Sequence, residues 1–280
     1  MDSFERLIGP KPTKQFLTQS GARLDALWKG RFDQQDARYQ HQRDMSEASF
    51  EVMRRVAGED PKLAATAKRI RVQAVANAKK KSPTLPLPPP KVPQRLRLGS
   101  ISATFTPPFW GRWVLRKRKG DGFTGNGGNV HGDTGRIDLS VRAGDADGGS
   151  AYEAAALGGY FHPPAANGIL NIFATPHMSY DFKTWYAFAS AKAGGFIGLY
   201  VGEYTLRGHF QTALVDQQID IGGSSVVPLG ASTWVDSDHF YEIWVWAGIN
   251  ASADGFHGLW YSSATALLNV HVPAISIFYT

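Results

Sequence analysis

His239 to Ala247 reads HFYEIWVWA, and this stretch decides the fold because it is apolar on both faces when it is drawn as a β-strand. Side chains of a strand alternate between its two faces. Trp244 and Trp246 therefore share one face, and Tyr241 and Ile243 share the other. A strand that is apolar on both faces is covered on both sides or meets a partner. The stretch predicts a central strand of a layered β structure.

The chain around this stretch keeps the two-residue period of β-strands. Arg136 to Arg142 (RIDLSVR) alternates between apolar and polar side chains, and Gly195 to Val201 (GFIGLYV) is rich in β-branched and aromatic residues. About ten such segments, separated by Gly, Pro and Asn turns, follow residue 99, and no helical pattern alternates with them. We therefore predict a mainly β fold over residues 99–280, an antiparallel, jelly-roll-like β-sandwich of about ten strands in two packed sheets.

Residues 1–81 have a helical pattern and are predicted to form an arm of two or three helices. Gly30 is expected to end the first helix, and Asp60-Pro61 to begin the third. The second helix has a narrow apolar stripe, which makes its residues candidates for assembly contacts: Phe32, Tyr39, Phe50 and Met53. Because thinly apolar helices are marginal in water, the stripe is expected to meet the β domain, a second copy or another protein. Residues 99–280 are expected to fold without the arm.

Residues 82–98 form a proline-rich linker between the two regions. Lys79 to Lys91 reads KKKSPTLPLPPPK, and its prolines exclude both a helix and a central strand. As polyproline II the linker could extend roughly 35–40 Å. Leu85 and Leu87 alternate with prolines and could dock on a surface. We expect a spacer, or an arm that lies on its own domain; a ligand for an aromatic groove is the alternative.

Charge is unevenly distributed along the 280 residues. Residues 1–99 carry a net charge of +10, and residues 100–280 carry −4. This asymmetry indicates either an acidic partner for the arm (nucleic acid, an anionic surface or another subunit) or simply a solvated basic surface.

The chain has no cysteine, which excludes disulfides and thiolate metal sites. Its start lacks the pattern of a secretory signal, and no apolar run could span a membrane, so we expect cytoplasmic synthesis, with action outside the cell only through release or within a particle.

The candidate binding residues are aromatic. Trp244 and Trp246, two positions apart on one face, would make a stacking platform for sugar rings if that face were exposed. The remaining candidates for this platform are Trp185, Trp260 and Tyr241. Burial in the core of the sandwich is the more expected place for the tryptophan pair.

Signals for metal binding and catalysis are weak. Asp145 and Asp147 have the spacing that begins a calcium loop, but the rest of that pattern is missing. The histidines make no HxH or HExxH pair, so no metal and no cofactor is expected. Asp236, Asp238 and Glu242 are close enough in sequence to suggest a glycosidase carboxylate pair, although the two aspartates have the character of turn residues.

These observations favour a non-enzymatic structural or assembly protein. The β-sandwich would form the head, and the helical arm would mediate oligomerisation or docking into a larger assembly. A basic helical arm, a proline-rich spacer and a β-sandwich head together resemble shell and fibre subunits of viruses and phages, at the level of architecture alone. A lectin-like carbohydrate-binding module is the second hypothesis, and a glycan-active enzyme is the third.

Overall fold

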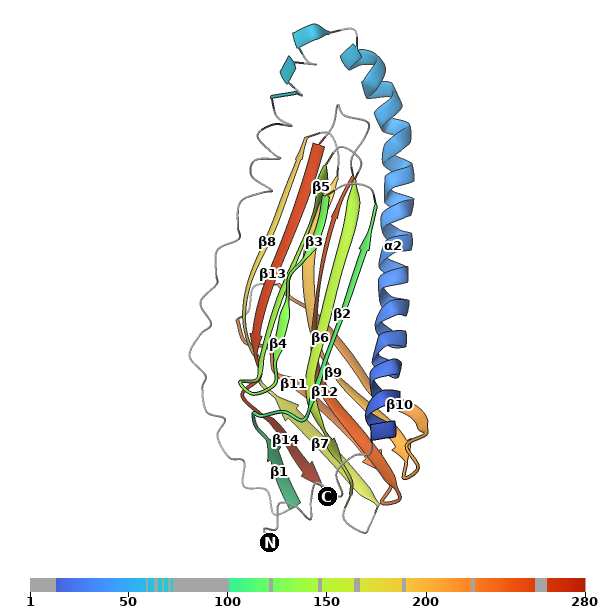
Figure 1. The fold of residues 1–280 in the computed structure, drawn as a ribbon, viewed down its shortest axis with the longest axis vertical. Coiled ribbons are helices and arrows are strands. Elements are labelled where there is room, and N and C mark those ends of the chain that lie inside the picture. The colour runs from blue at the N-terminus through green and yellow to red at the C-terminus, as the bar shows by residue number, and fades with distance from the viewer. Residues whose placement is uncertain are drawn as a thin grey trace.

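The structure is a computed structural model that describes residues 14–58, 60–62, 65, 66, 68, 69, 72, 101–120, 123–145, 148–163, 167–187, 190–222, 225–254 and 261–279. The helix α2 (Lys14–Gly58) precedes the strands, all of which pair in antiparallel fashion (Figure 1). The mainly β, antiparallel prediction is confirmed. The strands are β1 (Ile101–Phe105), β2 (Gly111–Lys119), β3 (Phe123–Asn126), β4 (Asn129–His131), β5 (Arg136–Asp145), β6 (Gly149–Phe161), β7 (Gly168–Ala174), β8 (His177–Ala187), β9 (Ala191–Thr205), β10 (Phe210–Asp220), β11 (Leu229–Val235), β12 (His239–Ala253), β13 (Tyr261–His271) and β14 (Ile275–Tyr279).

The described strands form three sheets rather than the two expected. The central sheet has the order β10-β9-β12-β6-β2. The second sheet, β3-β5-β13-β8, and the third sheet, β1-β14-β7-β11, share one hydrophobic core with one face of the central sheet. They follow one another along its length because β9 and β12, at 15 residues each, are long enough to reach both (Figure 1). Helix α2 covers the opposite face of the central sheet.

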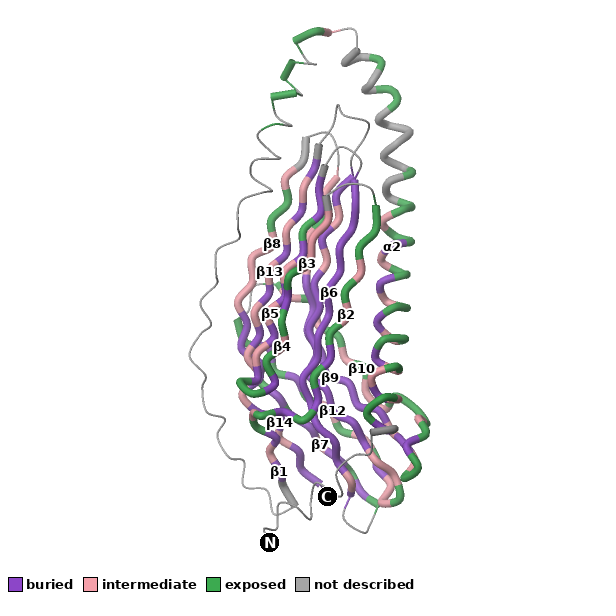
Figure 2. Tube along the Cα trace, in the orientation of Figure 1, coloured by how far each residue is buried: buried purple, intermediate pink, exposed green. Residues whose placement is uncertain are grey.

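Strand β12 has the central place that its sequence predicts. It pairs with β9 on one side and β6 on the other. Tyr241 and Ile243 face the core between the sheets, whereas Trp244 and Trp246 face α2. All four side chains are buried, and Figure 2 shows the whole middle of the central sheet as buried. Both faces of this strand are therefore covered by the same chain.

The buried positions of α2 recur every four residues: Phe16, Ser20, Leu24, Trp28, Phe32 and Asp36. Four residues turn a helix by about 400°, so such a stripe advances by about 40° at each step and winds around the helix. A winding stripe suits a twisted sheet, because the contact line on the sheet also rotates along its length. In Figure 2 the buried positions of α2 lie alongside the strands.

Gly30 does not end a helix, so that part of the prediction is wrong. The helix continues through it to Gly58. A glycine inside a helix costs about 1 kcal/mol relative to alanine. Trp28 and Phe32, one turn apart around it, are both fully buried against the sheet, and burying two such side chains stabilises the helix by more than that cost.

The arm shares its core with the sandwich and is not a separate layer held only by a linker. Without α2, the buried Trp244, Trp246 and Phe196 would face water. The expectation that residues 99–280 fold without the arm stays a prediction, and such a fragment would have to expose these rings. The proline-rich linker, residues 82–98, with Leu85 and Leu87, lies outside the described residues. Within the part of the chain that the structure describes, no helix is both long and apolar enough to cross a membrane.

Candidate functional site

The contact between α2 and the central sheet is built around Trp28. Its ring lies parallel to Phe196 at a centroid distance of 5.5 Å and meets Trp246 edge-on at 4.6 Å. The Arg31 guanidinium lies over the rings of Trp28 and Trp246, at 4.8 and 4.7 Å from their centroids. Aromatic pairs of this kind add about 0.5–1.5 kcal/mol each to the effect of burial.

Glycines on neighbouring strands make room for these rings. A Cβ atom on Gly111 would come within 2.2 Å of the Trp244 ring, and one on Gly198 within 2.4 Å of the Trp246 ring. The sheet therefore accommodates both indoles only because the facing positions carry no side chain. This arrangement explains why β12 can hold two tryptophans on its helix-facing side.

Polar contacts along the edges of this interface fix the register of α2. Trp113 donates its Nε1 hydrogen to Asp25 Oδ1 at 2.7 Å, and Tyr39 donates its hydroxyl hydrogen to the Ala253 carbonyl at 2.7 Å. Lys117 Nζ lies 3.0 Å from Asp36 Oδ2. These contacts involve both the beginning and the middle of the helix, so a shift of one turn would break them all.

Glu242 is the buried carboxyl group beneath the first turns of α2. Ser20 donates to its Oε2, and Tyr204 donates to its Oε1 at 2.7 Å. Burial raises the pKa of Glu242, and the hydrogen bonds from Ser20 and Tyr204 oppose that shift in part. The residue is thus a structural group of the helix contact, and its ionisation is less favourable in the folded chain than in water.

The predicted tryptophan platform is not exposed in this structure. Trp244 and Trp246 are only 3% and 1% exposed because α2 covers them, so they present no face to a sugar. Tyr241 is buried on the other side of β12. Trp185 is half-buried on β8, and Trp260 lies outside the described residues. The pair is therefore buried, as the alternative interpretation expected, but it lies beneath α2 and not in the core between the sheets.

The predicted assembly residues divide between the two halves of α2. Phe32 is fully buried against Tyr152 at a ring distance of 5.1 Å, and Tyr39 bonds to Ala253, so both serve the contact with their own sheet. The side chains of Phe50 and Met53 lie outside the described part of the structure, as do the side chain of Asp145 and the whole of Asp147. The weak calcium prediction therefore stays a prediction.

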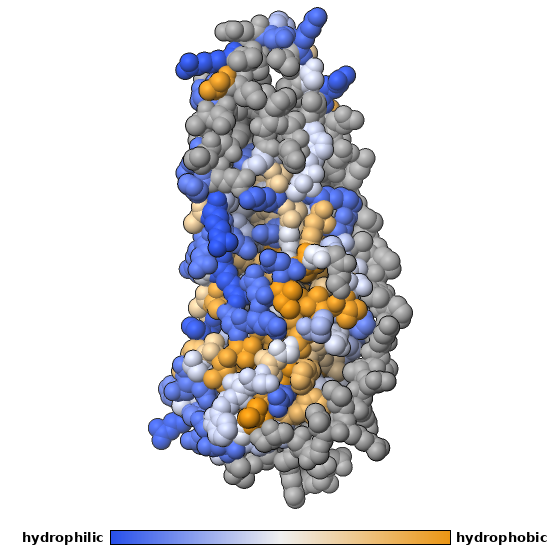
Figure 3. Space-filling model, turned by 180° about the vertical axis from the view of Figure 1, so that it is seen from behind, coloured by the Kyte–Doolittle hydropathy of each residue, from blue (hydrophilic) through white to orange (hydrophobic). Residues whose placement is uncertain are grey.

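An exposed apolar strip lies on the third sheet, and the sequence analysis did not predict it. Trp234 of β11 is 59% exposed and pairs in register with Ile169 of β7, which is 43% exposed. Phe173 of β7 is equally exposed. In the strand register, the Ser232–Asn171 pair lies between the Trp234–Ile169 pair and Phe173, and Ser232 donates its hydroxyl hydrogen to Asn171 Oδ1 at 2.6 Å. The alternation in Leu229–Val235 (LGASTWV) is the signal that could have placed Trp234 on an outer face. Figure 3 shows that apolar side chains also gather on the face that is turned away from the viewer in Figure 1.

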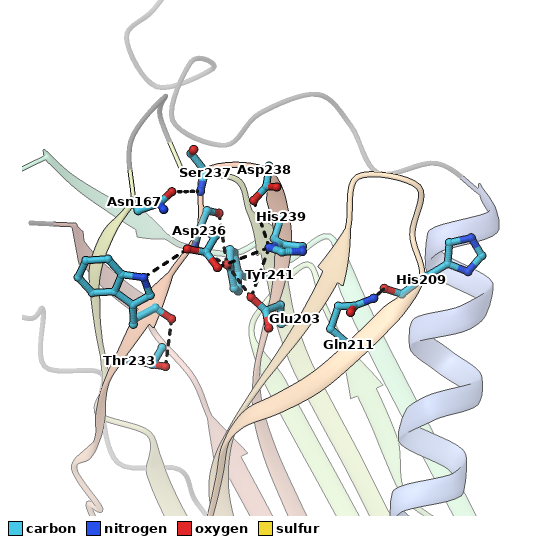
Figure 4. A network of polar contacts seen from close by, with 11 residues as sticks. Asn167, Glu203, His209, Gln211, Thr233, Asp236, Ser237, Asp238, His239 and Tyr241 are labelled. Atoms are coloured by element: carbon cyan, nitrogen blue, oxygen red, sulfur yellow. Dashed lines mark hydrogen bonds and ion pairs between the residues drawn. The ribbon is translucent and has the colours of Figure 1, made fainter.

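Beside Trp234, the turn between β11 and β12 holds a cluster of ionisable side chains (Figure 4). His239 Nδ1 lies 3.3 Å from Asp238 Oδ1, 3.6 Å from Glu203 Oε1 and 3.9 Å from Asp236 Oδ2. Glu242, which the sequence grouped with these two aspartates, instead bonds to Ser20 and Tyr204 on the helix side of β12. The structure therefore does not assemble the predicted carboxylate trio, and Glu203 and His239 take its place.

No protein-family model matches the chain, and a comparison with curated proteins finds no match. Among solved structures, the enzymatically active domain of tailspike protein 4 from bacteriophage CBA120 is similar at 8% identity and a TM-score of 0.26, over 60% of this chain and 19% of that one. TmCBM61 in complex with beta-1,4-galactotriose is similar at 9% identity and a TM-score of 0.20, over 59% and 88%. Infectious bursal disease virus, Gt strain, is similar at 8% identity and a TM-score of 0.23, over 69% and 46%. The chain thus spans about a fifth of the tailspike domain and under half of the viral chain. These likenesses are too weak to carry an argument about function.

Proposed function

We propose that the protein is a non-enzymatic structural subunit of a homo-oligomeric assembly, and that the distal half of α2 contacts another copy of the chain. The length of the helix carries this proposal. Its last described contact with the central sheet is made by Tyr39, and 19 residues of helix follow, which is about 28 Å. Figure 1 shows this half of α2 continuing past the ends of the strands.

The apolar pattern of the distal half supports a partner there. Phe50 follows Phe32 by 18 residues, which is five full helical turns, so both lie on one side of an ideal helix, with Met53 nearby. Val52 lies roughly on the opposite side and is 65% exposed. Because the described strands end before this half of the helix, a second copy is the occupant we propose.

Charge supports the same arrangement. The N-terminal 99 residues are basic (+10) and the remainder is acidic (−4), so the arm of one copy and the head of another attract each other. Such a subunit fits a shell or a fibre. Negative-stain images of the full chain would show closed particles or filaments.

The experiment is light scattering coupled to size exclusion, at several concentrations and at moderate salt. Wild-type chain is expected to form an oligomer. Phe50→Asp and Met53→Asp are expected to shift it to the monomer, because a charge on the apolar stripe opposes the contact. Val52→Asp is the matched control, an equal change on the exposed side of the same two turns, and should leave the oligomer intact. A wild-type chain that is monomeric at all concentrations would overturn the proposal.

A carbohydrate-binding function is the second candidate, carried by Trp234 rather than by the buried pair. Its exposed indole, next to the Ser232–Asn171 pair, offers an apolar surface with hydrogen-bonding groups beside it. Titration with oligosaccharides should change the tryptophan fluorescence of the wild type and leave Trp234→Ala unchanged. Trp110→Ala removes another exposed tryptophan, 49% exposed, and serves as the control. The absence of any glycan response in the wild type would remove this candidate.

A further inference from the structure

The cluster at the start of β12 has the composition of a metal site. Glu203, Asp236 and His239 each offer one ligand atom, and these atoms all lie within 4.8 Å of one another. Glu203 comes from β9, Asp236 from the turn after β11, and His239 from the first position of β12. A fourth group, Asp238, approaches the same imidazole nitrogen at 3.3 Å.

His239 Nδ1 is the atom that makes this arrangement unusual. It is shielded from solvent and has no hydrogen-bond partner of acceptable geometry, although oxygens of three carboxylates lie within 3.9 Å of it. A buried polar atom without a partner costs about 1–3 kcal/mol. A cation that the nitrogen and the carboxylates bind together would remove that cost.

Outer hydrogen bonds hold the carboxylates in place. Tyr241 OH donates to Glu203 Oε1 at 3.0 Å and accepts from the Asp236 backbone N–H at 2.7 Å. Trp234 Nε1 donates to Asp236 Oδ1 at 3.3 Å, which leaves Oδ2 toward His239. The Ser237 N–H donates to Asn167 Oδ1 at 2.9 Å and fixes the turn (Figure 4). Orienting bonds of this kind are typical of metal-ligating carboxylates.

We propose that Glu203, Asp236 and His239 bind one divalent transition-metal ion of the Zn²⁺ or Mn²⁺ type. Two ligands at bonds of 2.1 Å are about 3.4 Å apart in a tetrahedral site. The His239-to-carboxylate separations of 3.6 and 3.9 Å need little contraction, and the two carboxylates, whose ligand atoms lie within 4.8 Å of each other, would move together when the ion binds. Imidazole favours transition metals, whereas Ca²⁺ and Mg²⁺ prefer all-oxygen sites. The bound ion would join the end of β9 and the start of β12 to the turn that follows Trp234.

Isothermal titration calorimetry of the metal-free full chain with ZnCl₂, MnCl₂ and CaCl₂ in separate runs tests this site. We expect one Zn²⁺ or Mn²⁺ per chain, with little or no heat from Ca²⁺. His239→Ala and Glu203→Gln should weaken the binding at least tenfold. His209→Ala is the matched control, because this exposed histidine lies outside the cluster and contributes only backbone groups to the described hydrogen bonds (Figure 4).

A second readout separates loss of the site from loss of the fold. Trp234 donates to a proposed ligand, so Co²⁺ should quench part of the tryptophan fluorescence in the wild type and in His209→Ala. Quenching should be lost in Asp236→Asn, whose unperturbed far-UV circular dichroism would show an intact fold. No binding of Zn²⁺ or Mn²⁺ by the wild type, stronger binding of Ca²⁺, or equal loss in His209→Ala would overturn the proposal.

Discussion

Replacing Trp28 by alanine tests whether α2 is a layer of the core. The side chain is fully buried and contacts rings from β2, β9 and β12: Trp113, Phe196 and Trp246. Truncation of a buried tryptophan to alanine costs about 3–5 kcal/mol. At about 2–4 °C for each kcal/mol, Trp28→Ala should lower the Tm by roughly 6–20 °C.

Calorimetry or urea unfolding measures this change, and limited proteolysis shows where the structure opens. In Trp28→Ala we expect early cleavage within residues 16–39, because the remaining contacts of the helix are thinner. Lys29→Ala, at the neighbouring exposed position, should change stability by less than about 0.5 kcal/mol. A loss below about 1 kcal/mol in Trp28→Ala, with unchanged proteolysis, would refute the view that the helix completes the core.

Other substitutions test the details of the same interface. Burial raises the pKa of Glu242 in the folded chain, so its contribution to stability is present below its unfolded pKa and is lost as the pH rises through its folded pKa. The stability of Glu242→Gln relative to wild type should therefore rise with pH, by about 1.4 kcal/mol for each unit of the shift, and parallel Tm–pH profiles would contradict this. Gly198→Ala should destabilise the fold by more than about 2 kcal/mol in urea unfolding, because its Cβ would meet the Gln217 carbonyl at 1.9 Å. Gly222→Ala, which has open space, should be nearly neutral, and equal losses in the two variants would count against the packing described.

The sequence predicted the strands well where the pattern was local. Alternation in Arg136 to Arg142, which lies within β5, and the two apolar faces of β12 correctly indicated a β fold with a central, doubly covered strand. It did not predict what covers the second face. The stripe of α2 repeats every four residues and includes polar members such as Ser20 and Asp36, so it does not show as an apolar face of an ideal helix.

The candidate site was less predictable because it depends on contacts between distant segments. Glu203 and His239 are 36 positions apart, and only the pairing of β9 with β12 brings them together. Trp234 carried no distinguishing signal beyond its strand alternation. Conversely, Trp244 and Trp246 looked suitable for ligand stacking, but no local feature of the sequence showed that a helix some 200 residues earlier covers them.

Hydrogen exchange along α2, measured by mass spectrometry at low and at high protein concentration, distinguishes the part of the helix that packs on its own sheet from the part that meets a second copy. We expect slow exchange in residues 16–39 at both concentrations, because they pack on their own sheet. We expect fast exchange in residues 44–58 in the dilute chain and protection of the same residues in the concentrated one, as a second copy covers them. Fast exchange in the first segment, or exchange in the second that does not depend on concentration, would contradict this arrangement.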